Sequence, residues 1–249
     1  MHRTIIIMSH NRPIQYATQE ALAALRAAGA LLLTQSGTTD VTLARNLALS
    51  GVCDRLRAAN RRSTERDTVL MVDDDMVFTL DDAQRLVDYA RSTGMPASAA
   101  YATHMSTLAA TRLKTDPSAV QLWVTGLGFL AIPAAKLLEL EQRSEVFTTM
   151  QETRRGFTWS IADGGNYWSE DFTLCRRLGG VHLLPIPVGH VKPWPLYPDD
   201  ETLECIREGR RLPGELPTGG ELPFAGPCSS TAFATLAAFH DAPNMVGKN

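Results

Sequence analysis

One stretch decides the fold: residues 69–78 read VLMVDDDMVF, four apolar residues followed by three consecutive aspartates. A continuous apolar run of this length is typical of a strand that is buried on both faces of a sheet. The aspartates then fall at the carboxyl end of that strand, where open α/β sheets bind their ligands. The stretch therefore predicts a buried strand that ends in a binding site.

Three adjacent carboxylates repel one another, so a fold keeps them together either in solvent or around a cation. Oxygen ligands of this kind suit Mg²⁺ or Mn²⁺. The spacing of Asp73 and Asp75 lets two side chains on one side of the chain approach a single ion. The alternative is a strand-to-helix turn in which the aspartates only cap and solvate, and the stretch alone does not decide between the two.

The chain before this stretch predicts a parallel sheet. Residues 4–8 are β-branched and apolar, Pro13 opens a helix with Ala17, Ala21, Leu25 and Ala28 on its apolar face, and Gly29 ends it before a second strand at residues 30–34. A strand, a helix and a strand in this order form the crossover of a parallel, nucleotide-binding type of sheet.

The elements that follow alternate between helices and strands. We expect helices at residues 42–57, from the N-cap Thr79 to Gly94, at 133–141, and from the N-cap Ser169 to residue 178. We expect strands at 98–103, 119–124, 128–132 and 181–188, a mobile loop over 143–168, and a short helix near 203–208. The predicted fold class is α/β, with a mixed, mostly parallel sheet flanked by helices over residues 1–195 and a Pro/Gly-rich extension over 196–249.

Composition excludes several classes of protein. A formal net charge of −3 gives no general affinity for polyanions. The four cysteines are widely spaced without a Cys-x-x-Cys pair, so we expect reduced thiols in a cytoplasmic protein. No apolar run approaches the ~20 residues that a membrane span needs, so no stable membrane insertion is expected.

Several separated motifs together resemble the GT-A class of glycosyltransferases, which use a nucleotide sugar and usually a divalent metal. The resemblance covers about residues 4–195, and its motifs are short. They are Ile5-Ile6-Ile7, Arg45-Asn46, Val72-Asp73-Asp74-Asp75-Met76, Gly126-Leu127-Gly128-Phe129, Ser169-Glu170-Asp171-Phe172 and Gly189-His190. The resemblance implies a GT-A-like sheet, a nucleotide-sugar donor, most often a UDP-sugar, and Mn²⁺ or Mg²⁺ as the cofactor.

The resemblance also implies the metal ligands. Asp75 coordinates the ion, Asp73 lies by the ribose or helps to hold the ion, and His190 supplies a further ligand. A nitrogen ligand beside carboxylates favours Mn²⁺. Asp74 is then a spacer, and the alternative for His190 is a loop histidine before a proline-rich tail.

Asp171 is the candidate general base, which takes the proton from the acceptor hydroxyl in a single displacement that inverts the anomeric configuration. Glu170 is the weaker candidate. The alternative for both is ordinary acidic stabilisation of a helix amino terminus.

The remaining candidates concern the donor. Gly126 and Gly128 resemble the segment under the donor sugar, because glycine permits close approach, although a hairpin turn would also explain them. Ser9, Arg45 and Lys192 are candidate nucleotide contacts, since Arg pairs with phosphate oxygens in a fork. A solvated helix residue explains Arg45 equally well.

Two other functions remain open: a nucleotidyltransferase that makes a sugar nucleotide, and a noncatalytic nucleotide-sugar binding protein. The first usually has a Gly-rich loop after the first strand, whereas residues 9–13 read SHNRP. For the transferase, the acceptor is a glycan or a hydroxylated DNA base, and a DNA acceptor would need local basic patches such as Arg154 and Arg155.

Overall fold

The computed structural model describes residues 3–10, 13–36, 39–59, 66–104, 107–112, 122–149, 153–159, 161–163, 166–191 and 195–210. The chain divides into two compact units, Met1–Glu215 and Leu216–Asn249, and all described residues belong to the first. Most of the extension predicted over residues 196–249 therefore lies outside the described residues.

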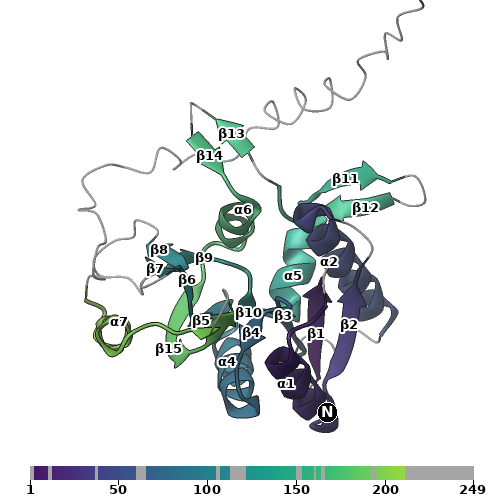
Figure 1. Ribbon diagram of the computed structural model, residues 1–249. Coiled ribbons are helices and arrows are strands. Elements are labelled where there is room, and N and C mark those ends of the chain that lie inside the picture. The colour runs from purple at the N-terminus through teal and green to yellow at the C-terminus, as the bar shows by residue number, and fades with distance from the viewer. Residues whose placement is uncertain are drawn as a thin grey trace, which may run out of the picture. The chain divides into compact units, whose positions relative to one another are not determined.

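The first unit is built on a six-stranded sheet (Figure 1). Five strands run in one direction, and β10 is antiparallel to both of its neighbours. In spatial order the strands are β15 (His182–Pro187), β5 (Ala97–Ala100), β10 (Phe129–Pro133), β3 (Thr68–Val72), β1 (Thr4–Ser9) and β2 (Leu31–Gln35). The predicted mixed, mostly parallel sheet is confirmed.

The central strands are buried on both faces, as their apolar runs predict. Every residue of β3 is buried. Val69 and Met71 contribute to one hydrophobic core, whereas Leu70 and Val72 contribute to the other. Each such side chain stabilises the fold by roughly 1.5–3 kcal/mol relative to exposure. Because alternate side chains of β3 enter opposite cores, the register of the strand is fixed, and Asp73 lies at the edge of the sheet.

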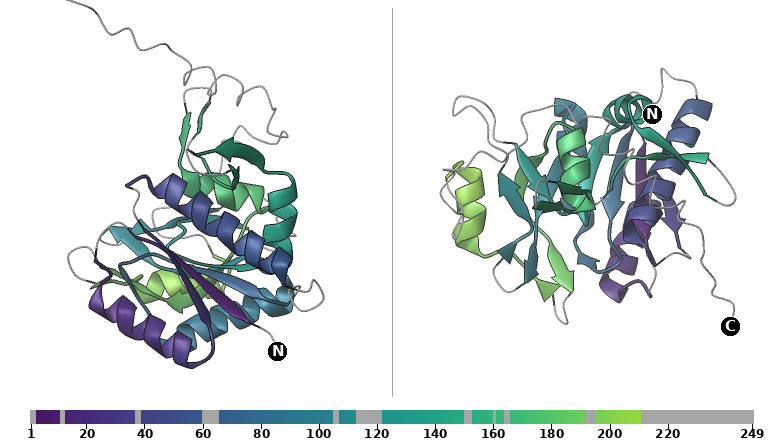
Figure 2. Two further views of the ribbon diagram at one scale, coloured as in Figure 1. Left: turned by 90° about the vertical axis from the view of Figure 1, so that its right-hand side faces the viewer. Right: turned by 90° about the horizontal axis from the view of Figure 1, so that it is seen from above.

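Helices cover both faces of the sheet and give three layers (Figure 2). One core packs α1 (Tyr16–Ala27) and α4 (Leu80–Thr93) against the sheet. The other includes α2 (Val41–Ala58), α5 (Ala134–Gln142), α6 (Glu170–Arg177) and α7 (Asp200–Arg207). None of the helices in the described part of the chain has the length and apolar character to cross a bilayer.

The ends of α4 follow the local sequence signals. Thr79 and Asp82 form a capping box, in which Thr79 Oγ1 accepts from the Asp82 backbone N–H and the Asp82 carboxylate accepts from the Thr79 N–H. Gly94 ends the helix at φ +68°, a left-handed conformation that glycine adopts without strain. Both predicted ends are confirmed.

The predicted start of the first helix is wrong, because α1 begins at Tyr16 and Pro13 lies before it. The reason is a tertiary hydrogen bond: the Gln15 N–H donates to the carbonyl of Asp74 at 2.9 Å, which holds Gln15 in an extended conformation. Thr18 then faces the acidic turn, and its Oγ1 donates to the Met76 carbonyl at 2.7 Å. The chain after β1 is therefore tied to the aspartates.

The loop predicted over residues 143–168 is also wrong, since the described part of this segment contains two antiparallel strand pairs. One joins β11 (Glu145–Thr148) to β12 (Thr153–Gly156), and the other joins β13 (Ile161–Asp163) to β14 (Asn166–Trp168). The rings of Phe147 and Trp159 pack edge to face at 5.3 Å. These four strands are three or four residues long, and none shows the alternation of apolar and polar residues that identifies a strand in a sequence.

Short strands surround the carboxyl edge of the main sheet. β16 (Gly189–Val191) pairs with β4 (Met76–Val77) and with β17 (Pro195–Leu196). β6 (Ala102–His104) pairs with β7 (Thr107–Leu108), and β8 (Ala110–Arg112) with β9 (Trp123–Thr125). Because β9 and β10 pair with different strands, the segment between them is not a hairpin turn.

Three cysteines, Cys53, Cys175 and Cys205, are buried and free, which confirms the predicted thiols at these positions. Cys228 lies outside the described residues.

Candidate functional site

Three of the motifs, Asp73-Asp74-Asp75, Ser169-Glu170-Asp171 and Gly189-His190, are joined by side-chain contacts at the carboxyl edge of β3. Arg45, on the first turns of α2, contacts both the acidic turn and the start of α6, and His190 of β16 contacts Asp75. Residues separated by more than 100 positions therefore form one polar site.

Arg45 pairs with three carboxylates at once. Its Nη2 donates to both oxygens of Asp73 at 3.2 and 3.1 Å, and its Nη1 donates to Glu170 Oε1 at 2.9 Å and to Asp171 Oδ1 at 2.7 Å. The Arg45 side chain is only 6% exposed, whereas those of Asp73 and Asp171 are 31% and 29% exposed. The guanidinium thus lies beneath carboxylates that open to solvent.

The neighbouring Asn46 fixes the backbone on which this arrangement depends. Its side-chain oxygen accepts from the N–H groups of Phe157 and Thr158 at 2.8 and 3.0 Å, and its amide donates to the Thr158 carbonyl. Thr158 Oγ1 in turn donates to the Glu170 carbonyl. Helix α2 therefore holds the start of α6 through backbone and side-chain contacts, and the fully buried Asn46 is structural.

The charges of this group do not balance, because one guanidinium faces three carboxylates. Burial raises the pKa of Asp171 to about 6; the positive charge of Arg45 opposes this, and Glu170 and Asp73 add to it. Burial alone would lower the pKa of Arg45, but the same carboxylates raise it above its usual value. The carboxylate of Asp171 is thus more basic than that of an ordinary aspartate, a property that suits a general base.

Asp75 and His190 form a second pair in the site. His190 Nε2 lies 3.2 Å from Asp75 Oδ1, and its Nδ1 lies 3.1 Å from the carbonyl of Ala102. A carbonyl oxygen only accepts, so Nδ1 carries a hydrogen and donates it. Nε2 then faces the carboxylate oxygen of Asp75.

These residues fit a divalent ion in their chemistry. Asp75 is 2% exposed, and the Ala102 carbonyl orients the ring of His190 through Nδ1, as a hydrogen bond on the other ring nitrogen usually does for metal-ligating histidines. The excess negative charge around Arg45 also favours a cation. Within the described residues, no group of three or more His, Cys, Asp or Glu side chains is arranged as a metal site. Metal binding therefore stays a prediction.

The two glycines come close to protein atoms in the site. A Cβ added at Gly128 would lie 3.1 Å from Asp73 Oδ2, and one at Gly126 would lie 2.2 Å from the hydroxyl of Tyr101. Gly128 N–H also donates to that hydroxyl at 3.0 Å, and its carbonyl accepts from the Asp73 N–H. The backbone at these glycines therefore does pass close to other groups, namely the side chains of Tyr101 and Asp73. Contact with a donor sugar stays a prediction.

We expect Gly126→Ala to lower the melting temperature, because the new methyl group would lie 2.2 Å from the hydroxyl of the buried Tyr101. The loss should be about 1–3 kcal/mol in the free energy of unfolding, as for other overpacked positions. Tyr101→Phe in the same chain should recover much of this loss, since it removes the atom that is hit. Equal melting temperatures for the single and double variants would contradict this contact.

Tyr101 is a site residue that sequence reasoning missed. Its ring packs edge to face on His190 at 5.7 Å, and it is 4% exposed. The one available signal was an isolated aromatic residue at the end of an alanine-rich strand, at the same edge as the aspartates.

The other predicted donor contacts are less defined. Ser9 ends β1 at the carboxyl edge and pairs in register with Gln35, and nothing here tests its contact with a nucleotide. Lys192 lies outside the described residues. Arg45 is occupied by carboxylates, so a phosphate would have to compete with them for its guanidinium.

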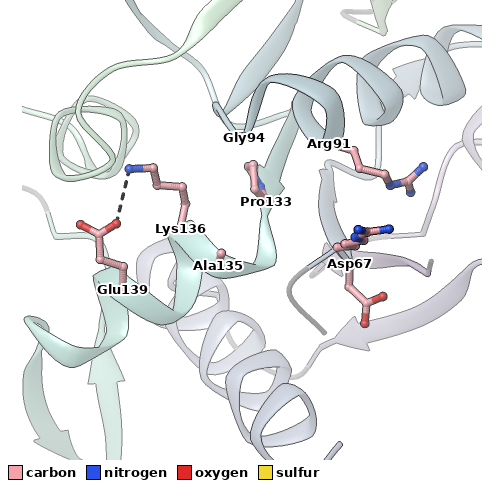
Figure 3. A pocket seen from close by; sticks show the side chains of 8 residues that line it. Asp67, Arg91, Gly94, Pro133, Ala135, Lys136 and Glu139 are labelled. Atoms are coloured by element: carbon pink, nitrogen blue, oxygen red, sulfur yellow. Dashed lines mark hydrogen bonds and ion pairs between the residues drawn. The ribbon is translucent and has the colours of Figure 1, made fainter. Parts of the chain in front are cut away.

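A cavity of about 190 Å³ lies at the opposite end of β3 and contains none of the predicted site residues (Figure 3). Arg91 from α4 and Lys136 from α5 line it together with Asp67 and Glu139. These charges already have partners: Arg91 pairs with Asp88, Lys136 with Glu139, and Asp67 with Arg3.

Comparisons with known proteins leave the site to be judged on its geometry. No model of a known protein family matches the sequence, and no curated protein matches it. Among solved structures, the crystal structure of A197 from STIV matches with a TM-score of 0.40 and 16% identity. That match covers 54% of this chain and 66% of the other.

Proposed function

We propose that this protein is a metal-dependent glycosyltransferase of the GT-A type. It would move a sugar from a nucleoside-diphosphate sugar, in the first instance a UDP-sugar, to an acceptor hydroxyl with inversion. The observation that carries the proposal is the position of Asp171, a partly exposed carboxylate that Arg45 holds together with Asp73 of the Asp-x-Asp turn, at the carboxyl edge of a mostly parallel sheet. Burial raises the pKa of Asp171, which supports its role as a base. The single antiparallel strand of that sheet agrees with the mixed sheet that the resemblance implies.

The chemical step follows from the residues in named roles. Asp171 takes the proton of the acceptor hydroxyl, and the oxygen attacks the anomeric carbon from the side opposite the diphosphate. The bond from that carbon to the diphosphate oxygen breaks, and the nucleoside diphosphate leaves with the electron pair. One displacement inverts the configuration, because the carboxylate never bonds to the sugar.

Asp75 and His190 are the residues that would hold the ion, with Asp73 beside them. A bound Mn²⁺ or Mg²⁺ supplies a Lewis acid that neutralises charge on the leaving diphosphate. The mixed nitrogen and oxygen donors favour Mn²⁺. Asp73, held by Arg45, is then available to a hydroxyl group of the donor through its exposed oxygen atoms.

A glycan acceptor agrees better with the described surface than duplex DNA does. Two of the arginines that could form basic patches are engaged, since Arg154 pairs with Asp54 and Arg155 donates to the Ser144 carbonyl. Of the others, Arg61 and Arg62 lie outside the described residues. If DNA is nevertheless the acceptor, its affinity should fall steeply as salt rises.

The rate of transfer should fall on the acid side of neutrality. Asp171 acts only when ionised, and its pKa is raised to about 6, so kcat should decline about tenfold for each pH unit below that value. A pH profile of kcat at saturating donor and acceptor measures this limb. A profile that stays flat down to pH 4.5 would show that a carboxylate of ordinary pKa, or none, accepts the proton.

The test of the function is a panel of nucleotide sugars with Mn²⁺, in which free nucleoside diphosphate is measured with and without simple glycan acceptors. Slow hydrolysis of one donor, accelerated by an acceptor, is the expected result. Release of diphosphate from a nucleoside triphosphate and a sugar phosphate would instead indicate a nucleotidyltransferase. Donor binding without turnover would indicate a binding protein, and inactivity with no donor-induced rise in melting temperature would reject the proposal.

A further inference from the structure

Arg45 is buried beneath the site and touches both of its halves. Through Nη2 it holds Asp73, on the side of the predicted donor and metal, and through Nη1 it holds Asp171, the candidate base. These two carboxylates come from positions 98 residues apart in the chain, and Arg45 reaches both from a third element, α2.

We propose that Arg45 is a positioning residue, which sets the candidate base Asp171 in place against the donor-side carboxylate Asp73. The expected effect on the reaction rests on the proposed glycosyl transfer. The link that Arg45 forms between Asp73 and Asp171, called the Arg45 link below, rests on the hydrogen bonds alone. It gives Arg45 a task different from the phosphate contact expected from its sequence.

The burial of Arg45 supports this role over direct contact with substrate. Its side chain is 6% exposed, and four hydrogen bonds of 2.7–3.2 Å to carboxylates occupy Nη1 and Nη2. The more exposed side chains are those of the carboxylates that it holds, at 31% for Asp73 and 29% for Asp171. A substrate can thus reach Asp73 and Asp171 while Arg45 stays underneath.

The shape of the guanidinium explains why arginine is needed. Its planar fork directs two nitrogens in fixed, diverging directions, so one side chain fixes the relative position of two acidic segments. A lysine ammonium carries the same charge at a single point and cannot span the same set of acceptors. Arg45→Lys therefore retains the charge while it releases the geometry.

The kinetic test compares Arg45→Lys with the wild type in the transfer assay. We expect kcat to fall by about 100-fold, because small misplacements of a base cost this much. The KM for donor should stay within about threefold. In the double variant with Asp171→Asn, the substitution at Arg45 should add no more than about threefold, since the base through which it acts is already gone.

A matched control lies on the same helix. Arg57 of α2 is half exposed and pairs with Asp54 and with the buried Glu141, so Arg57→Lys loosens arginine–carboxylate pairs on the same helix without touching the site. It should lower stability while leaving kcat within about threefold. Any of three results would overturn the proposal. They are equal losses of kcat in both lysine variants, an unchanged kcat in Arg45→Lys, and a loss in the double variant equal to the product of the losses in Arg45→Lys and Asp171→Asn.

A double-mutant cycle on melting temperatures tests the Arg45 link between Asp73 and Asp171 without any enzyme assay. If no donor is turned over but this cycle gives the expected result, only the proposed function has failed. Asp73→Asn and Asp171→Asn share Arg45 as a partner, so their shifts in melting temperature should not add. We expect the double variant to differ from the sum of the single shifts by at least about 2 °C. Additive shifts would overturn the Arg45 link, and this measurement also decides the matter if Arg45→Lys does not fold.

Discussion

Asp171→Asn should abolish sugar transfer while leaving donor binding intact. The amide has nearly the same shape and still accepts a hydrogen bond from Arg45, but it cannot take a proton from an acceptor hydroxyl. General base catalysis contributes about 10²–10⁴-fold, so kcat should fall by that factor. Isothermal titration with the nucleoside diphosphate and Mn²⁺ should give an affinity within about threefold of the wild type.

The same variant should fold at least as stably as the wild type at pH 7. Burial raises the pKa of Asp171 to about 6, whereas an unfolded aspartate titrates near 3.9. The folded protein therefore binds this proton more readily, and the contribution of Asp171 to stability rises as the pH falls from about 6 to about 4. At pH 7 the ionised side chain is a cost of folding, which a neutral amide removes while Asp73 and Glu170 still neutralise Arg45.

Glu170→Gln is the matched control, since Glu170 is the adjacent carboxylate and also pairs with Arg45, at 2.9 Å. We expect it to retain kcat within about tenfold. A larger loss in Glu170→Gln than in Asp171→Asn would make Glu170 the base. Full activity in Asp171→Asn would remove both the base and the simple inverting step from the proposal.

The parts of the fold that the sequence predicted well are those with local causes. The strand β3 follows from an apolar run that is buried on both faces, and α4 follows from a capping box and a left-handed glycine. The start of α1 was misplaced because a tertiary hydrogen bond from Gln15 to Asp74 overrides the local preference of Pro13 for a first helical turn. Local sequence signals therefore predict the end of a helix unless a hydrogen bond to a residue far away in the sequence competes with them.

The site shows the same division. Its ingredients were visible as motifs: Asp73 and Asp171 meet on Arg45, and Asp75 meets His190. The role of Arg45 was not visible, because its contact with Asp171 spans 126 positions and depends on how α2 and α6 lie against one another. Residue type indicates a capacity to pair with anions, and only the packing decides whether the anion is a ligand or a carboxylate.

The pair of Asp75 and His190 leads to the second large effect. Nε2 of His190 faces the carboxylate of Asp75, and a hydrogen bond to the Ala102 carbonyl fixes the ring. Asp75→Asn keeps the volume of this side chain but removes its charge, so the site loses the anion that would attract a cation. Since even outer-shell changes cost 10–100-fold in metal affinity, we expect Mn²⁺-dependent binding of the nucleoside diphosphate to weaken by at least about 100-fold.

Asp74→Asn is the control for this effect, because Asp74 is the adjacent carboxylate, is similarly buried and is predicted to be a spacer. Its affinity for the Mn²⁺ nucleotide should stay within about threefold of the wild type. Titration of both variants with and without Mn²⁺ separates loss of the metal from loss of the nucleotide, since binding that remains without Mn²⁺ should be equal in the two. If Asp74→Asn is the variant that loses Mn²⁺, the working pair is not Asp73 and Asp75. If neither variant does, the acidic turn is the capping and solvating turn that remained the alternative, and the three aspartates serve the fold and not a metal.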